Sequence, residues 1–200
     1  MDFTSKFDLE RIGIANNAAR QPDKPALIMN DEQVSFKQLD DQTNALANAL
    51  LQLGIIPGDR ICMLFYNSPE IMKIWTAAGK ISVTPIALNY RFKADELAFI
   101  INDSQSRLLI YSHEFDEVVA TARPKFTDAS VQFIRWGRES LSGVLSLDDL
   151  IENAPDTPPQ VQSEAHGVAS SLIYTSGTTG RPKGVVRGIK NRLNSLLGYA

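Results

Sequence analysis

The sequence predicts an α/β fold in which a layered, largely parallel sheet has helices on both faces. Short apolar runs alternate with amphipathic segments along residues 1–154, and the links between them are short. This alternation is the pattern of parallel sheets, in which each strand needs a crossover segment to reach the next. Hydrophobic residues make up 44% of the 200-residue chain, which is enough to form the buried core of one compact domain.

The strands of this fold are predicted from short runs of apolar and β-branched residues bounded by turn residues. They cover residues 26–29, 33–36, 61–65, 83–88, 107–111, 131–135 and 170–174. The helices are predicted from apolar residues spaced three and four positions apart. They cover residues 8–20, 36–53, 93–102, 113–122 and 146–153, with a further helix that begins at residue 69.

Several boundaries of these elements carry local signals. Ser35 and Gln38 have the spacing of a capping box at the start of helix 36–53. Ser68 and Pro69 combine a favoured cap residue with proline at the first helical position. Pro85 has no backbone N–H, so strand 83–88 is predicted to lie at an edge of the sheet or to end there.

The chain divides into three segments by composition. Residues 1–154 are predicted to form an α/β subdomain, and the prolines that follow predict a linker-like segment over residues 155–169. Residues 170–200 are predicted to contain a phosphate-loop hairpin and the start of the following helix. The family resemblance described below implies that the chain is truncated within that helix.

The distribution of charge is uneven. Net charge is −3, but residues 165–200 contain five basic and no acidic residues, which leaves 15 bases and 23 acids in residues 1–164. A local positive field for a nucleotide polyphosphate explains this asymmetry, and a chance spread of charge is the alternative. A nucleic-acid site is disfavoured because no aromatic side chain for base stacking lies among these bases.

The remaining composition signals indicate a cytoplasmic protein without a membrane span or a structural metal. The N-terminus lacks the pattern of a secretory signal, and no apolar run approaches ~18 residues. The single cysteine, Cys62, lies in an apolar run and is predicted to be a buried, inert thiol. His113 and His166 have no carboxylate or nucleophile at an informative spacing, and no Cys/His cluster predicts a metal site.

One loop carries the candidate chemistry. Between the apolar runs at 172–174 and 185–186, the chain is rich in hydroxyls and glycines and ends in Pro182 and Lys183. Glycines let the backbone approach phosphate oxygens, successive N–H groups can form an anion-binding concavity, and the lysine supplies positive charge. The loop matches neither the Walker pattern nor the dinucleotide-binding pattern. A flexible hairpin loop without a ligand is the alternative.

The sequence of this loop, T-S-G-T-T-G-R-P-K-G-V, resembles the phosphate loop of the adenylate-forming superfamily. This superfamily includes acyl- and aryl-CoA ligases, luciferases and amino-acid-adenylating domains. Weaker landmarks in the family's order lie at residues 35–39, 53–60, 67–70, 95–97 and 103–104. The resemblance therefore covers essentially the whole chain. The Thr178–Thr179 pair is more similar to CoA ligases and luciferases than to the adenylating domains of peptide synthetases.

The resemblance implies a set of ligands and site residues. The ligands are ATP, Mg²⁺, coenzyme A and a carboxylic acid that the sequence does not specify. The residues implied to contact ATP are Thr175, Ser176, Gly177, Thr178, Thr179, Gly180 and Lys183. Among them, Thr178, Thr179 and Lys183 are the implied catalytic residues, which neutralise charge on the departing pyrophosphate.

Two departures from the family pattern leave two interpretations of function. Ile189 stands where the family usually has a histidine, and the chain lacks the later motifs for adenine, Mg²⁺ and ribose and the catalytic lysine of the C-terminal domain. The first interpretation is the N-terminal part of a carboxylate–CoA ligase. The second is a catalytically incompetent truncated or split polypeptide that binds nucleotide or a partner, or self-associates through exposed apolar residues near its end.

Overall fold

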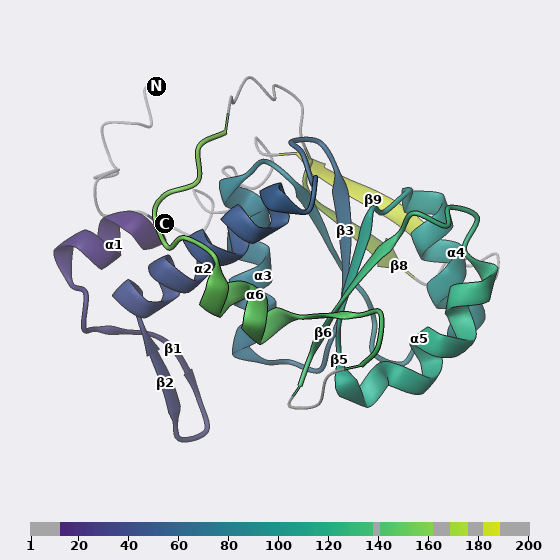
Figure 1. The fold of residues 1–200 in the computed structure, drawn as a ribbon, viewed down its shortest axis with the longest axis horizontal. Helices are drawn as coiled ribbons and strands as arrows, with labels where there is room; N and C mark the ends of the chain where they lie inside the picture. Colours follow the sequence, from purple (N-terminus) through teal and green to yellow (C-terminus); the bar gives the residue numbers. More distant parts are fainter. Residues whose placement is uncertain (1–12, 138–140, 162–168, 176–181, 189–200) are drawn as a thin grey trace.

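The computed structural model describes residues 13–137, 141–161, 169–175 and 182–188. Five parallel strands form the centre of the molecule, in the order β4–β3–β5–β6–β7 (Figure 1). Their bounds are β3 (Arg60–Leu64), β4 (Thr84–Ala87), β5 (Leu108–Ser112), β6 (Gln132–Trp136) and β7 (Leu145–Ser146). The predicted fold class, a layered parallel sheet with helices on both faces, is confirmed.

The strand order is that of a doubly wound sheet. From β3 the chain first moves outward to β4 and then returns to pair β5 with the other side of β3. Counted along the chain, these parallel strands therefore have the order 2-1-3-4-5, with the change of direction between β3 and β5. Pro85 lies in the edge strand β4, as predicted.

Helices cover both faces of this sheet. The α-helices are α1 (Ile14–Arg20), α2 (Phe36–Gln52), α3 (Pro69–Lys80), α4 (Ala94–Ser104), α5 (Asp116–Ala122) and α6 (Leu147–Asn153). Two short 3₁₀ helices, η3 (His113–Phe115) and η4 (Arg123–Lys125), flank α5. Figure 1 shows α2, α3 and α6 on one side of the sheet and α4 and α5 on the other.

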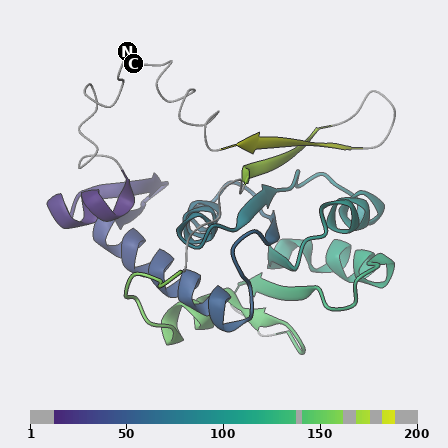
Figure 2. The same ribbon diagram turned by 90° about the horizontal axis from the view of Figure 1, so that it is seen from above.

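Two antiparallel hairpins complete the described structure. The first consists of β1 (Pro25–Met29) and β2 (Glu32–Ser35), joined at Asn30, whose φ of 53° is left-handed. The second consists of β8 (Ala169–Thr175) and β9 (Lys183–Gly188). In Figure 2 this second hairpin lies next to β4, at the end of the sheet opposite β7.

The core has two parts because neighbouring strand residues point to opposite faces of the sheet. Ile61 of β3 packs with Leu46 of α2 and Ile74 of α3 in one cluster. The next residue, Cys62, packs with Leu97 of α4 in the other cluster, which also contains Leu172 and Tyr174 of β8. The hairpin is therefore attached to the same face of the sheet as α4 and α5.

The local boundary signals are largely confirmed. Ser35 accepts a hydrogen bond from the Gln38 backbone at 3.2 Å, and the Gln38 side chain accepts one from the Ser35 N–H at 2.9 Å, which completes the predicted capping box. Ser68 occupies the predicted cap position of α3, but its hydroxyl makes no cap hydrogen bond and is buried without a partner. Pro69, at the first position of α3, has its own φ fixed near the helical value, so the helix can begin there without a cap hydrogen bond.

Two details differ from the predicted elements, and the segment after α6 makes a contact that the sequence did not predict. Helix 8–20 was expected to start at residue 8; residues 8–12 lie outside the described ranges, and α1 begins at Ile14. Strand β7 has only two residues and was not predicted, because so short a run has no periodicity. The start of segment 155–169 is held against α2, where the Asn48 side chain donates to the carbonyls of Pro155 and Thr157 at 2.8 and 2.9 Å.

The two serine caps make a matched pair for a stability test. Ser35→Ala removes both the hydroxyl and its bond to Gln38, and should lower the free energy of unfolding by about 1 kcal/mol. Ser68→Ala removes a hydroxyl that has no partner, so stability should change by less than about 0.5 kcal/mol. Urea unfolding followed by circular dichroism measures both. Equal losses in the two variants would contradict the assignment of the capping box.

Candidate functional site

The β8–β9 hairpin brings the two ends of the predicted phosphate loop together. Thr175, the last residue of β8, pairs directly with Lys183, the first residue of β9. Both side chains are exposed to solvent. The first hydroxyl and the lysine of the predicted site therefore stand opposite each other at the mouth of the loop, one on each strand.

The other predicted ligands lie within the loop itself. Residues 176–181 are outside the described ranges, and they include Ser176, Gly177, Thr178, Thr179 and Gly180. Their role as phosphate ligands therefore stays a prediction. Of the seven predicted ATP contacts, Thr175 and Lys183 are the two that the structure places.

One residue before the loop, Tyr174 turns into the core. Its ring packs in the cluster with Leu172 and α4, and its hydroxyl donates to Asp103 Oδ2 of α4 at 2.6 Å. Burial, and then the hydrogen bond to Asp103, raise the pKa of the Tyr174 phenol well above its usual value, so the hydroxyl keeps its proton. The strand that enters the loop is thus connected to a helix that is distant in sequence.

A second group of side chains gathers where the parallel strands end. Tyr66 follows β3, Tyr90 follows β4 and Phe115 follows β5; the Tyr66 ring lies 5.1 Å from that of Tyr90 and 5.0 Å from that of Phe115. The Arg91 guanidinium lies 5.3 Å from the centre of the Tyr90 ring. Tyr66 and Tyr90 are 49% and 44% exposed, so their rings are accessible.

This aromatic group occupies the position where doubly wound sheets bind ligands, outside the carboxyl ends of the strands at the change of direction. Sequence reasoning missed these residues. The signal that could have found them is an aromatic residue within four positions after each of the predicted strands 61–65, 83–88 and 107–111.

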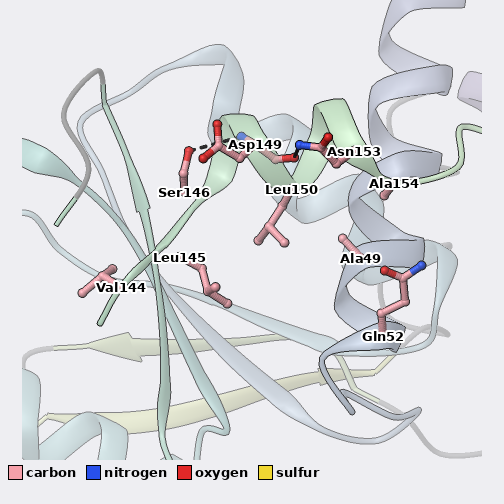
Figure 3. Close-up of a pocket in the computed structure, with 9 residues that line it drawn as sticks. All are labelled: Ala49, Gln52, Val144, Leu145, Ser146, Asp149, Leu150, Asn153 and Ala154. Carbon is pink, nitrogen blue, oxygen red and sulfur yellow. Dashed lines mark hydrogen bonds between the residues drawn. The ribbon is translucent and has the colours of Figure 1, made fainter. Parts of the chain in front are cut away.

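A hollow of about 360 Å³ lies elsewhere, between α2 and the β7–α6 segment (Figure 3). Val144, Leu145 and Leu150 form its apolar part, and Gln52 and Asn153 lie at its polar part. Because β7 and β4 are at opposite ends of the sheet, this hollow is separate from the hairpin that carries the phosphate loop.

The predicted burial of Cys62 is confirmed, whereas the interpretation of the two histidines stays a prediction. Cys62 is fully buried, its Sγ lies 3.1 Å from Ser106 Oγ, and burial raises its thiol pKa to about 11. His113 is half-exposed and lies beside Glu114 and the Trp136 ring. His166 lies outside the described residues. Within the described ranges, no helix is both long and apolar enough to cross a bilayer.

The doubly wound parallel sheet, with the β8–β9 hairpin beside it, defines the class: a doubly wound α/β protein. The family model described as "AMP-binding enzyme" matches residues 14–200, and the chain belongs to this family. Membership of the adenylate-forming enzymes, which the loop and its landmarks predicted, is thereby confirmed.

Relatives and solved structures agree with this assignment. The chain is 35% identical to rat long-chain fatty acid transport protein 1 over 84% of its own length and 27% of that protein. It is 34% identical to the long-chain-fatty-acid–CoA ligase FadD13 of Mycobacterium tuberculosis, over 78% of its length and 30% of that enzyme. The crystal structure of the anthranilate CoA ligase AuaEII, in complex with anthranoyl-AMP, matches with a TM-score of 0.79 at 28% identity, over 86% of this chain and 33% of that one.

The chain therefore spans about a third or less of the length of these proteins. It also matches a structure of the N-terminal domain of FACL13 from Mycobacterium tuberculosis, with a TM-score of 0.73 at 29% identity over 87% of this chain and 42% of that one. The chain therefore matches the N-terminal portion of the acyl-CoA ligases among these relatives.

The burial of Cys62 predicts its reactivity. With a pKa of about 11 and no exposed surface, the thiol should stay unmodified by a thiol reagent at about pH 8 in the folded chain. Unfolding in urea should restore the pKa to its ordinary value and permit complete modification. Mass spectrometry before and after unfolding measures both states. Rapid labelling of the folded chain would contradict the inert role.

Proposed function

We propose that this chain is the N-terminal part of an ATP-dependent carboxylate–CoA ligase, and that its hairpin loop binds the β- and γ-phosphates of ATP. The observation that carries the proposal is the pairing of Thr175 with Lys183, which gathers a hydroxyl and a cation at one loop mouth. The family match and the CoA ligases among the relatives support it.

The reaction of such an enzyme has two steps. A carboxylate oxygen of the substrate attacks the α-phosphorus of ATP, the bond to the β-phosphate breaks, and an acyl-adenylate and pyrophosphate form. The thiol of coenzyme A then attacks the acyl carbon, and AMP leaves with the bonding electrons. Negative charge grows on pyrophosphate in the first step, so positive charge and hydrogen-bond donors around the β- and γ-phosphates lower its barrier.

In this proposal the loop residues have separate tasks. Lys183 contributes a positive charge from the β9 side, and Thr175 contributes a hydroxyl from the β8 side. Thr178 and Thr179 donate to the phosphates from within the loop, whose glycines, Gly177 and Gly180, let the backbone come close. Ser176 supplies a further hydroxyl.

Mg²⁺ and coenzyme A complete the proposed set of ligands. Among the described residues, no group of three carboxylate, histidine or cysteine side chains could hold a metal ion, so Mg²⁺ is expected to enter bound to the phosphates of ATP. The exposed rings of Tyr66 and Tyr90, with Arg91 beside them, offer a stacking surface and a positive charge. We assign this aromatic group to the nucleotide part of coenzyme A.

Two hundred residues are not expected to complete the reaction by themselves. The chain spans about a third of the CoA ligases that it matches, and the carboxylic acid substrate is left open. Binding of phosphate by the loop is the part of the proposal that can be measured on this chain, because the hairpin and its attachment to the sheet lie within it.

The charge of Lys183 makes the proposal testable. Lys183→Ala should weaken binding of magnesium pyrophosphate by about tenfold, because it removes a charge-assisted contact. Lys183→Arg should retain most of the affinity. Lys24→Ala, at an exposed lysine in the turn before β1, is the control and should leave binding unchanged. Titration calorimetry measures all of them, and equal binding by the wild type and Lys183→Ala would overturn the proposed role.

A second function, association with another polypeptide, is favoured by the outer face of the hairpin. Ile173 and Val185 are cross-strand partners on this face, and they are 38% and 52% exposed. Two-stranded hairpins are marginally stable alone, and adjacent exposed apolar side chains favour contact with a further layer. The residues expected to mediate association from the sequence, Leu193, Leu196, Leu197 and Tyr199, lie outside the described ranges.

Association through this face predicts concentration-dependent oligomers. The double variant Ile173→Thr, Val185→Thr keeps β-branched side chains in the strands and removes apolar surface, so it should shift the chain toward monomer. Ile28→Thr, at a 66% exposed residue of β1, is the matched control and should have no effect. Light scattering over a range of concentrations provides the measurement. A wild type that stays monomeric at high concentration would rule out self-association.

A further inference from the structure

Tyr174 lies at the point where the hairpin enters the predicted phosphate loop. It pairs across the hairpin with Gly184, and the next pair outward is Thr175 with Lys183. Any shift of Tyr174 therefore moves both residues at the loop mouth. The position of this ring sets where the two predicted phosphate contacts stand relative to the sheet.

The absence of a side chain at Gly184 leaves room for the Tyr174 ring. A Cβ at this position would lie 3.2 Å from Tyr174 Cζ and 3.2 Å from Leu172 Cδ1, which is closer than most side chains tolerate. The strand that leaves the loop consequently runs directly over the ring of the strand that enters it. Both ends of the loop are fixed against one side chain.

The other end of that side chain is bonded to the rigid part of the molecule. The Tyr174 hydroxyl donates to Asp103 Oδ2 at 2.6 Å, the length of a charge-assisted O–H···O⁻ bond. Asp103 lies in the last turn of α4, a helix whose buried residues Leu97, Ile100 and Ile101 pack on the parallel sheet. This contact joins residues that are 71 positions apart in the chain.

Asp103 is in an unfavourable place for the stability of its own helix. A negative charge in the last turn opposes the helix macrodipole, which favours positive charge there. A helix optimised only for its own stability would not have an aspartate at this position. The hydrogen bond from Tyr174 stabilises the Asp103 carboxylate, whereas the dipole of the helix destabilises it.

We propose that Tyr174 and Asp103 act as a positioning pair. Their hydrogen bond holds Thr175 and Lys183 in the position relative to the sheet that the loop needs in order to bind phosphate. Neither residue touches the ligand. The inference rests on the proposed function, because it assigns these residues a task for the same loop. The pair acts through the ring, which fixes the base of both strands of the hairpin.

The test separates positioning from stability with three variants of the 200-residue chain. Tyr174→Phe keeps the buried ring and removes the hydroxyl, whereas Asp103→Asn keeps an acceptor oxygen and removes the charge. Tyr111→Phe is the matched control, because Tyr111 is a buried tyrosine in the same core cluster whose phenol pKa is raised by burial and by the nearby Asp116 carboxylate.

Two measurements are made on each variant. Amide hydrogen exchange followed by NMR reports the opening of Lys183–Gly188 relative to β3 and β5. Titration calorimetry reports the affinity for magnesium pyrophosphate. We expect Tyr174→Phe to speed exchange in the β8–β9 hairpin but not in β3 and β5, and to weaken binding about tenfold, since a charge-assisted bond is lost. Asp103→Asn should have an intermediate effect, and Tyr111→Phe should change neither quantity.

Each outcome decides one part of the proposal. Unchanged exchange of β9 in Tyr174→Phe would overturn the pair as an anchor of the hairpin. Faster exchange with unchanged affinity would overturn its role in positioning the phosphate contacts and leave a stabilising bond only. If the wild type binds no pyrophosphate, the proposed function of the loop fails, and with it the ligand part of this inference, whereas the exchange data still decide the anchor.

Discussion

The apolar side chains on both faces of a parallel sheet have to be buried, and this requirement determines where the helices and the second hairpin lie. All five residues of β5 are buried, as are four of the five residues of β3. Helices α2 and α3 cover one face, and α4 and α5 cover the other. Leu172 and Tyr174 of the hairpin extend the second cover at the β4 end. The element that carries the predicted site is thus part of the core of the sheet.

Elements with local causes were predictable from the sequence. The capping box of Ser35 and Gln38 fixes the start of α2 from residues three positions apart, and the missing N–H of Pro85 places β4 at an edge. Strand order has no such local cause, because pairing of β3 with β5 joins segments more than 40 residues apart. The burial of the Ser68 hydroxyl without a partner is likewise a product of packing.

The candidate site shows the same division. The loop that begins at Thr175 was found because its residue types and spacing are contiguous. The bond between Tyr174 and Asp103 connects distant segments, and no sequence pattern predicts it. The contacts around Tyr66 and Tyr90 also join distant segments, and the sequence indicates them only through aromatic residues that follow predicted strands. They exist because neighbouring parallel strands place their carboxyl ends at one edge of the sheet, and because the hairpin packs against α4.

Pro85 has a further consequence for how the hairpin is attached. The N–H groups of Thr84 and Leu88 donate to β3, at the carbonyls of Asp59 and Met63, so the proline faces the outer edge of β4. That edge lacks one donor at its centre, and β8 lies beside it without joining the sheet. The hairpin is therefore held by side chains and not by a backbone ladder. Its place beside β4 consequently depends on the buried side chains of Leu172 and Tyr174 and on the bond between Tyr174 and Asp103.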